Sequence, residues 1–250
     1  MSARRPLGCL PLTRTISRLK ISAGRPIILR MRQATRLLQT TALLILAWLP
    51  TCVWGETVKF QDAPAGALPP GWVGTQTGKG TAAWTIARDK SSPGKLHVLK
   101  QSGEADYPVC IKQDTRLKDG IVEAHFKPLA GKEDQAGGVI WRVKDKDNYY
   151  VCRANALEGN VVLYKTVDGT RKALDIVGRN GGYGVKAPVA PAQWHTLRVD
   201  FHGSRFAVTF DGKHLFDVED DTLREAGHVG VWTKADSVTE FDYFTYEEAK

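Results

Sequence analysis

The segment from Ala136 to Thr170 constrains the fold more than any other part of the chain. It contains three runs rich in Val, Ile, Tyr and Trp, separated by polar turns at 144–148 and 157–160, and it ends at Asp168-Gly169. β-Branched and aromatic residues suit the pleated, half-buried surface of a sheet, and Asp, Asn and Gly are typical turn residues. The segment therefore predicts three consecutive antiparallel strands.

Successive side chains of a strand point to opposite faces, so the middle strand can be divided into two sides. One side is apolar and is predicted to face the core: Tyr150, Cys152, Ala154 and Ala156. The opposite side contains Tyr149, Arg153 and Asn155, and charged or amide side chains are rarely buried without partners. We expect this second side to meet water or a ligand.

The same alternation can be applied to the strands on either side. In the preceding run it places Val139, Trp141 and Val143 on one face. Arg142 then falls on the other face. We therefore predict one sheet surface that carries these side chains: Arg142, Tyr149, Arg153, Asn155 and Lys165.

Short runs of the same kind continue along the chain, and we count about a dozen predicted strands. One helical turn is predicted, at 221–226. Residues 56–80 are predicted to form an ordered wrap in place of a strand, which Trp72 within Pro-Pro-Gly-Trp anchors to the body of the domain. Many short strands with regular turn signals indicate a single antiparallel sandwich or barrel.

The positive charge of the chain is concentrated at its N-terminus. The formal net charge is +8, but residues 1–55 contain nine Lys or Arg and no Asp or Glu. Subtracting these nine from 35 basic residues leaves 26 against 27 acidic residues. The remainder is nearly neutral, which removes the electrostatic argument for a nucleic-acid partner.

Residues 31–55 have the three parts of a secretory signal, and residues 1–30 are an upstream extension. Arg32 and Arg36 precede an apolar run at 41–49, and Gly55 offers a small residue before cleavage. The run is shorter than the roughly 20 residues that span a bilayer. We predict cleavage before Glu56, a periplasmic or secreted domain at 56–250, and no membrane attachment after cleavage.

Cys110 and Cys152 both lie in predicted strands of the exported part. In an oxidising compartment such a pair often forms a disulfide, whereas two buried thiols would pack as small apolar groups. The sequence leaves both alternatives open.

The sequence shows no nucleophile motif and no metal-binding spacing of His or Cys. We expect no cofactor, with calcium at the Asp145–Asn148 turn as the alternative, since carboxylate and amide oxygens suit that ion. The same residues are ordinary turn formers.

A second candidate lies near the C-terminus. Trp232 alternates away from Val231, and Lys234 and Asp236 follow on its side. An aromatic ring beside a cation and a carboxylate is typical of sugar recognition, because the ring contacts C–H groups while the charges bond hydroxyls. A core Trp beside a rim ion pair is the structural alternative.

Seven motifs together resemble a known group of exported proteins: Gly137–Arg142, Asn148–Tyr150, Arg153–Asn155, Asn160–Tyr164, Gln193–Val199, Gly230–Ser237 and Phe241-Asp242. The chain is similar to concanavalin-A-like proteins described as 3-keto-disaccharide hydrolase-like. The resemblance covers most of 58–246 and implies an all-β, concanavalin-A-like jelly-roll sandwich of two antiparallel sheets, with a concave side that faces sugar.

The resemblance does not identify catalytic residues. The Glu-x-Asp-x-Glu pattern of laminarinase-type glucanases is absent, and an acid or base could be Asp236, Glu123 or His125. Two functions remain: a glycan-directed hydrolase or lyase, or a non-catalytic module that binds carbohydrate or an envelope protein. In a third, structural interpretation, the Arg and Asn side chains only lock the strands together. The predicted carbohydrate-binding residues are Arg142, Tyr149, Arg153, Asn155, Trp232, Lys234 and Asp236.

Overall fold

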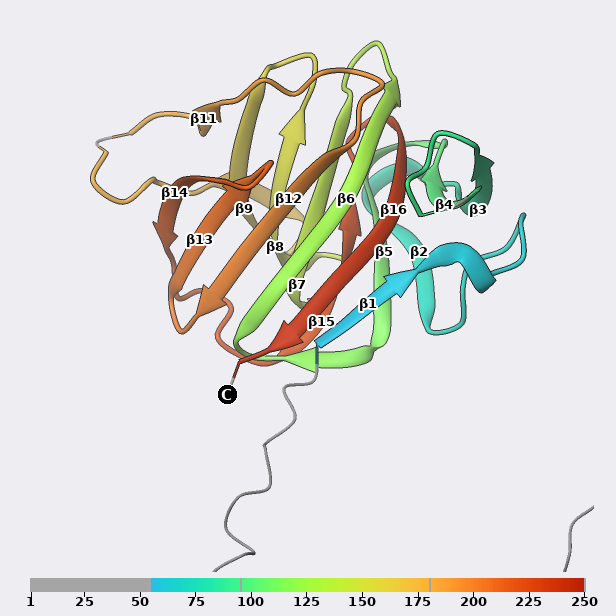
Figure 1. Cartoon of the computed structure of the whole chain (residues 1–250). Coiled ribbons are helices and arrows are strands. Elements are labelled where there is room, and N and C mark those ends of the chain that lie inside the picture. The colour runs from blue at the N-terminus through green and yellow to red at the C-terminus, as the bar shows by residue number, and fades with distance from the viewer. Residues whose placement is uncertain (1–54, 95, 180, 250) are drawn as a thin grey trace, which may run out of the picture. The chain divides into compact units, whose positions relative to one another are not determined.

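The computed structural model describes residues 55–94, 96–179 and 181–249, and they form an all-β sandwich of two antiparallel sheets (Figure 1). The predicted signal and upstream extension lie outside the described residues, apart from Gly55. Among the described residues, no helix has the length and apolar character needed to cross a membrane. The jelly-roll prediction is confirmed.

Sheet A contains eight strands. In spatial order they are β14 (Lys213–Glu219), β13 (Arg205–Phe210), β12 (His195–His202), β6 (Gly120–Ala130), β16 (Val238–Glu248), β4 (Leu96–Gln101) and β3 (Trp84–Asp89), with β1 (Gly55–Lys59) also paired to β16. A 3-10 turn, η1 (Phe60–Asp62), follows β1.

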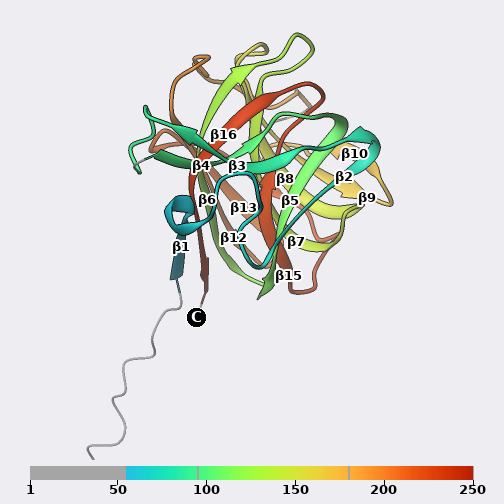
Figure 2. The same cartoon turned by 90° about the vertical axis from the view of Figure 1, so that its right-hand side faces the viewer.

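Sheet B also contains eight strands. In spatial order they are β10 (Thr170–Ala173), β9 (Asn160–Val167), β8 (Asn148–Asn155), β7 (Ala136–Asp145), β15 (Gly227–Trp232), β5 (Glu104–Leu117) and β2 (Trp72–Thr81), with β11 (Val185–Lys186) paired to β9. The predicted three-strand meander is β7, β8 and β9, and it extends from the middle of this sheet to the strand beside the edge strand β10 (Figure 2).

The main core lies between the sheets and is built from the alternating apolar side chains of both. Tyr150, Cys152 and Ala154 belong to it, as the alternation in β8 predicts. Trp72 is also buried there, with its ring 5.7 Å from that of Phe60 and 5.6 Å from that of Phe244. The buried position of Trp72 agrees with its predicted anchoring role, but the prediction of a wrap in place of strands is wrong, because the segment contains β1 and Trp72 is the first residue of β2.

The alternation fails at one place in β7. Against β15, β7 advances three residues from Ile140 to Val143 where its partner advances two, which is a β-bulge. Arg142 occupies the bulge with a left-handed φ of 48°. Val143 consequently joins Ile140 on one face, and Arg142 no longer shares the face of Arg153.

The two cysteines are buried free thiols. They lie in one row across sheet B, in which Cys152 is opposite Val139, Val139 opposite Val231, and Val231 opposite Cys110. Three interstrand spacings separate them by about 14 Å, too far for a disulfide. Burial raises the pKa of both thiols, so they are unreactive.

The segment 221–226, predicted as a helical turn, is irregular in the structure. Asp220 accepts hydrogen bonds from Tyr150, Lys165 and the amide of Thr222 instead. Lys165 therefore lies on the Tyr150 side of the sheet, and its predicted place beside Arg153 is wrong.

Candidate functional site

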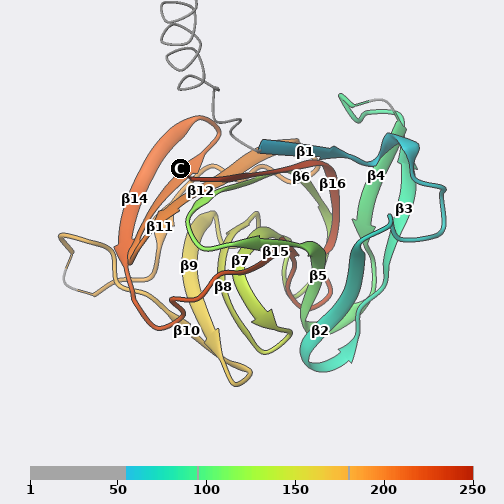
Figure 3. The ribbon, with the colours of Figure 1, turned by 90° about the horizontal axis from the view of Figure 1, so that it is seen from below.

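The face of sheet B that points away from sheet A, called here the outer face of sheet B, carries a second apolar cluster. Its members are Val109, Ile111, Ala136, Ile140, Val143, Tyr149, Val151, Val162, Tyr164 and Trp232. Figure 3 shows sheet B as a curved layer with the edge strands β10 and β2 at its two ends. The curvature brings large side chains together on this face.

Arg153 lies on this face and makes four side-chain contacts there. Its Nη1 donates to the Asn160 side-chain oxygen, and its Nη2 donates to Glu158 Oε2 at 2.8 Å and to the hydroxyls of Tyr164 and Tyr183, each at 3.1 Å. Arg153 is 1% exposed, and its Nε has no partner among the described residues. A buried arginine with this many polar partners is held in one orientation.

Asn155 extends these contacts toward the next loop. Its Nδ2 donates to the carboxylates of Asp134 and, at 3.2 Å, Glu158. Asp134 in turn accepts from Lys234. We call the connected set the Arg153 network: Asp134, Arg153, Asn155, Glu158, Asn160, Tyr164, Tyr183 and Lys234.

The electrostatics of the network favour the ionised form of Glu158. Burial of Glu158 by itself would raise the pKa of its carboxyl, but the positive charge of Arg153 and the hydrogen bond from Asn160 outweigh burial and lower that pKa. Glu158 is consequently a weak base and a firm acceptor for the groups that it orients.

Asp236 holds the loop that carries Asp134. Its carboxylate accepts from the backbone amides of Lys132 at 2.6 Å, Glu133 at 3.1 Å and Asp134 at 3.1 Å. Burial would raise the pKa of Asp236, and these amides lower it instead. Asp236 therefore holds the 132–134 loop, and with it Asp134, in place. This role differs from the direct sugar contact predicted for Asp236.

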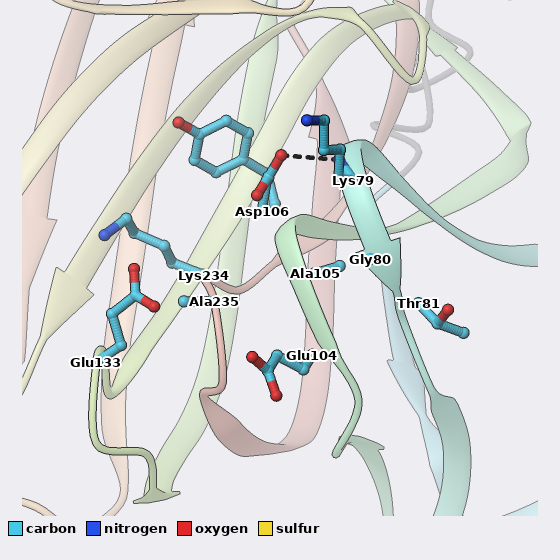
Figure 4. A pocket seen from close by; sticks show the side chains of 10 residues that line it. Lys79, Gly80, Thr81, Glu104, Ala105, Asp106, Glu133, Lys234 and Ala235 are labelled. Atoms are coloured by element: carbon cyan, nitrogen blue, oxygen red, sulfur yellow. Dashed lines mark hydrogen bonds between the residues drawn. The ribbon is translucent and has the colours of Figure 1, made fainter.

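A cavity of about 600 Å³ adjoins the network. Tyr107 and Lys234 line it together with Lys79, Glu104, Asp106 and Glu133. Figure 4 shows Glu133 and Lys234 along one side and Asp106 beside Lys79 on the other, with Asp106 accepting from the Lys79 amide at 2.7 Å. The cavity is polar, mixed in charge and large enough for a sugar unit.

The structure brings Arg153, Asn155, Lys234 and Asp236 together, but it places Arg142 elsewhere. The Arg142 guanidinium donates to the carbonyls of Lys118 at 2.8 Å, Leu223 at 3.0 Å and Gly203 at 2.6 Å, and to Asp119 at 3.1 Å. These partners belong to three loops, so Arg142 joins the loops. The bulge in β7 is the physical reason that Arg142 does not share the face of Arg153 as predicted, and a sugar contact by Arg142 stays a prediction.

Tyr149 and Trp232 lie on the expected face but are fully buried. The Tyr149 hydroxyl is 2.8 Å from Thr77 Oγ1, and the Trp232 ring stacks on Tyr107 with centroids 5.9 Å apart. Neither ring can stack directly on a sugar in this arrangement, so their predicted stacking role is corrected to support. The aromatic rings open to a ligand on this face are Tyr107, which is half-buried, and Tyr183, which is 51% exposed.

Sequence reasoning missed the partners that complete the network: Asp134, Glu158, Asn160, Tyr164 and Tyr183. Extending the alternation across the 155–160 turn would have placed Tyr164 on the face of Arg153, because Val151 pairs with Tyr164. The other four lie in turns, in a loop or at the start of a strand, where the alternation of side chains along a strand cannot predict which face of the sheet a residue joins.

The remaining candidates lie outside the network. His125 and Glu123 are on β6 of sheet A, where His125 stacks between Trp194 and Tyr243 and Glu123 accepts from the Tyr243 hydroxyl at 3.2 Å. The Asp145 carboxylate accepts from Asp147 N and the Asn148 side chain, which is turn chemistry, and calcium there stays a prediction. No group of three or more His, Cys, Asp or Glu suited to a metal ion occurs in the described residues.

Comparison with known proteins shows which folds and which family this chain is similar to. Among solved structures, a carbohydrate binding module, CBM66, from Bacillus subtilis is 20% identical, covers 71% of this chain and 96% of its own, and superposes with a TM-score of 0.55. A β-glucanase from Bacillus licheniformis is 10% identical over 78% of this chain and 98% of its own, with a TM-score of 0.47. The first of these likenesses confirms the fold.

No curated protein matches the chain. A family model described as 3-keto-alpha-glucoside-1,2-lyase-like domain matches residues 68–244, which include the whole Arg153 network and all strands except β1 and the end of β16. The chain therefore belongs to the 3-keto-alpha-glucoside-1,2-lyase-like family.

Proposed function

We propose that the protein binds a glycoside on the outer face of sheet B, in the cavity and beside the exposed members of the Arg153 network, which the buried Arg153 and Asn155 hold in place. The observation that carries this proposal is the network itself: eight polar side chains from separate strands and loops, connected on one face beside a cavity. Hydroxyl-rich ligands need such fixed donors and acceptors, and aromatic rings beside them contact the C–H faces of sugars.

The family description and the cavity together favour a 3-keto-glycoside as ligand. A ketone at C3 makes the C2 proton acidic, and a 1,2-lyase removes that proton while the C1–O bond breaks and its electrons go to the leaving oxygen, which takes up a proton. Lys234 is a cation that could stabilise negative charge on the C3 oxygen. The carboxylates able to accept the C2 proton line the same cavity: Glu104, Asp106 and Glu133.

A second candidate function is binding without turnover. It is favoured by the ion pairs of the two network carboxylates, because Asp134 pairs with Lys234 and Glu158 with Arg153. A carboxylate held by a cation is a poor proton acceptor. The likeness of the fold to a carbohydrate binding module agrees with this candidate.

One experiment separates these functions. The protein is incubated with methyl 3-keto-α-glucoside and with the parent glucoside, binding is measured by calorimetry, and methanol release is followed in parallel. Turnover of the keto compound supports the lyase, and binding without release supports the module. Binding of neither compound would refute the proposed site.

Tyr183→Phe provides the variant that links the ligand to this face. It removes a hydroxyl that contacts Arg153 and Tyr164 from an exposed side chain, so we expect weaker sugar binding with little change in stability. Tyr243→Phe removes a comparable hydroxyl from sheet A and serves as the matched control, with unchanged binding.

A further inference from the structure

Arg153, Lys234 and Arg171 lie close together on the outer face of sheet B, and they differ in whether a carboxylate balances their positive charge. Arg153 lies 2.8 Å from Glu158, and Lys234 pairs with Asp134. Arg171 has no carboxylate within ion-pair distance among the described residues. One positive charge on this face is therefore uncompensated.

Arg171 is held by aromatic rings instead. It lies on the edge strand β10, opposite Thr166 of β9. Its guanidinium carbon is 4.6 Å from the ring centre of Tyr107, 4.3 Å from that of Tyr164 and 5.5 Å from that of Trp232. Cation–π contact fixes the guanidinium in place but leaves its N–H groups without acceptors.

The hydrogen bonding of Arg171 is incomplete. Its Nη1 is buried without a hydrogen-bond partner, while the residue as a whole is only half-buried. The position of the aliphatic stem of Arg171 could be explained by its covering the apolar cluster, since long basic side chains often cover apolar surface. It does not explain a charged head with an unpartnered donor, which is unfavourable unless an acceptor binds.

The position of Arg171 joins the two parts of the site. Tyr164 belongs to the Arg153 network, and Tyr107 lines the cavity. Arg171 is not itself in the cavity lining, but its guanidinium carbon is 4.6 Å from the ring centre of Tyr107, which is. Arginine presents a planar fork of donors that matches a carboxylate, and also a sulfate or phosphate ester.

We propose that the glycoside recognised by this protein carries an anionic group on the sugar, and that Arg171 is the residue that binds this group. This inference rests on the proposed function, because it names the class of sugar for the same site. The shared chemistry is a planar or tetrahedral oxyanion attached to a sugar ring, as in a uronic acid or in a 6-sulfated or 6-phosphorylated glucose.

The test compares neutral and charged sugars on the purified protein. Calorimetry is performed with methyl α-glucoside, methyl α-glucuronoside, glucose 6-sulfate and glucose 6-phosphate, at low salt and in about 0.5 M NaCl. We expect at least one charged sugar to bind about 10-fold or more tightly than the neutral glucoside, as a charge-assisted hydrogen bond to arginine supplies. High salt should reduce the preference.

Two variants assign the effect to Arg171. Arg171→Met keeps an unbranched apolar stem over the aromatic rings and removes the charge, so the preference for the charged sugar should disappear while neutral binding persists. Lys172→Met removes one positive charge from the neighbouring exposed position of the same strand and should keep the preference. Melting temperatures of both variants show that the fold is retained.

Each outcome decides between the proposals. Equal affinity for charged and neutral sugars would overturn the role of Arg171 and leave the proposed function intact, with Arg171 only covering the apolar cluster. Retention of the preference in Arg171→Met would also overturn it. Binding of no sugar at all would refute the proposed function and this inference together. Which charged sugar binds most tightly identifies the source of the anion.

Discussion

Replacement of Arg142 by methionine should destabilise the fold without affecting the sugar site. The guanidinium makes four hydrogen bonds of 2.6–3.1 Å that join the loops at Lys118–Asp119, Gly203 and Leu223. The residue is 2% exposed, and its guanidinium carbon lies 5.8 and 5.6 Å from the rings of Phe201 and Phe206. Methionine can keep the ring contacts but none of the hydrogen bonds.

The expected loss of stability follows from these four hydrogen bonds. At about 1 kcal/mol net for each bond, because solvent can replace part of the loss at the loops, the free energy of unfolding should fall by about 4 kcal/mol. For a domain of this size, that corresponds to a drop in Tm of roughly 8–16 °C.

Thermal unfolding of the purified protein followed by circular dichroism measures this change. Arg198→Met is the matched control, because Arg198 pairs with Asp200 at the surface, and such pairs contribute less than about 1 kcal/mol. A change in Tm below about 3 °C for Arg142→Met, or a loss of sugar binding at unchanged Tm, would refute the assignment of Arg142 to loop joining.

Three further predictions concern other parts of the domain. The pKa of Asp236 is lowered by the amides that it accepts from, so the ionised carboxylate stabilises the fold above about pH 4 and this contribution is lost as the pH falls further. The difference in Tm between wild type and Asp236→Ala should therefore shrink below about pH 4. A difference in Tm that stays constant with pH would contradict the stabilising role of these hydrogen bonds. Iodoacetamide should leave Cys110 and Cys152 unmodified in the native protein and should modify both after denaturation without reductant, as mass spectrometry would show; two protected cysteines in the denatured protein would indicate a disulfide. Gly137→Ala should destabilise by about 1–3 kcal/mol in denaturant titration, because the added Cβ would lie 2.2 Å from the Phe126 ring, and wild-type stability would contradict this contact.

The faces of the central strands could be predicted where the strand is regular. Alternation alone assigned Tyr150, Cys152 and Ala154 to the core and left Arg153 and Asn155 on the other face. The prediction succeeded because a one-residue change of register would have moved the whole apolar set out of the core, so the apolar pattern fixes the register.

The candidate site could be predicted only in part. Arg142 was misplaced because a bulge reverses the alternation, and the bulged residue is a non-glycine with positive φ that no local motif announces. Glu158 and Tyr183 reach Arg153 from a turn and a loop, and their approach depends on tertiary packing. The burial of Trp232 depends on Arg171 and Tyr107, which come from strands distant in sequence.

A crystal structure of the protein soaked with methyl 3-keto-α-glucoside tests the central claim most directly. The account predicts electron density for the sugar on the outer face of sheet B, with its oxygens in hydrogen-bond contact with Tyr183 or Lys234 and its ring beside Tyr107. Density on the surface of sheet A beside His125, or in the region of Arg142, would contradict the assignment of the Arg153 network as the carbohydrate site.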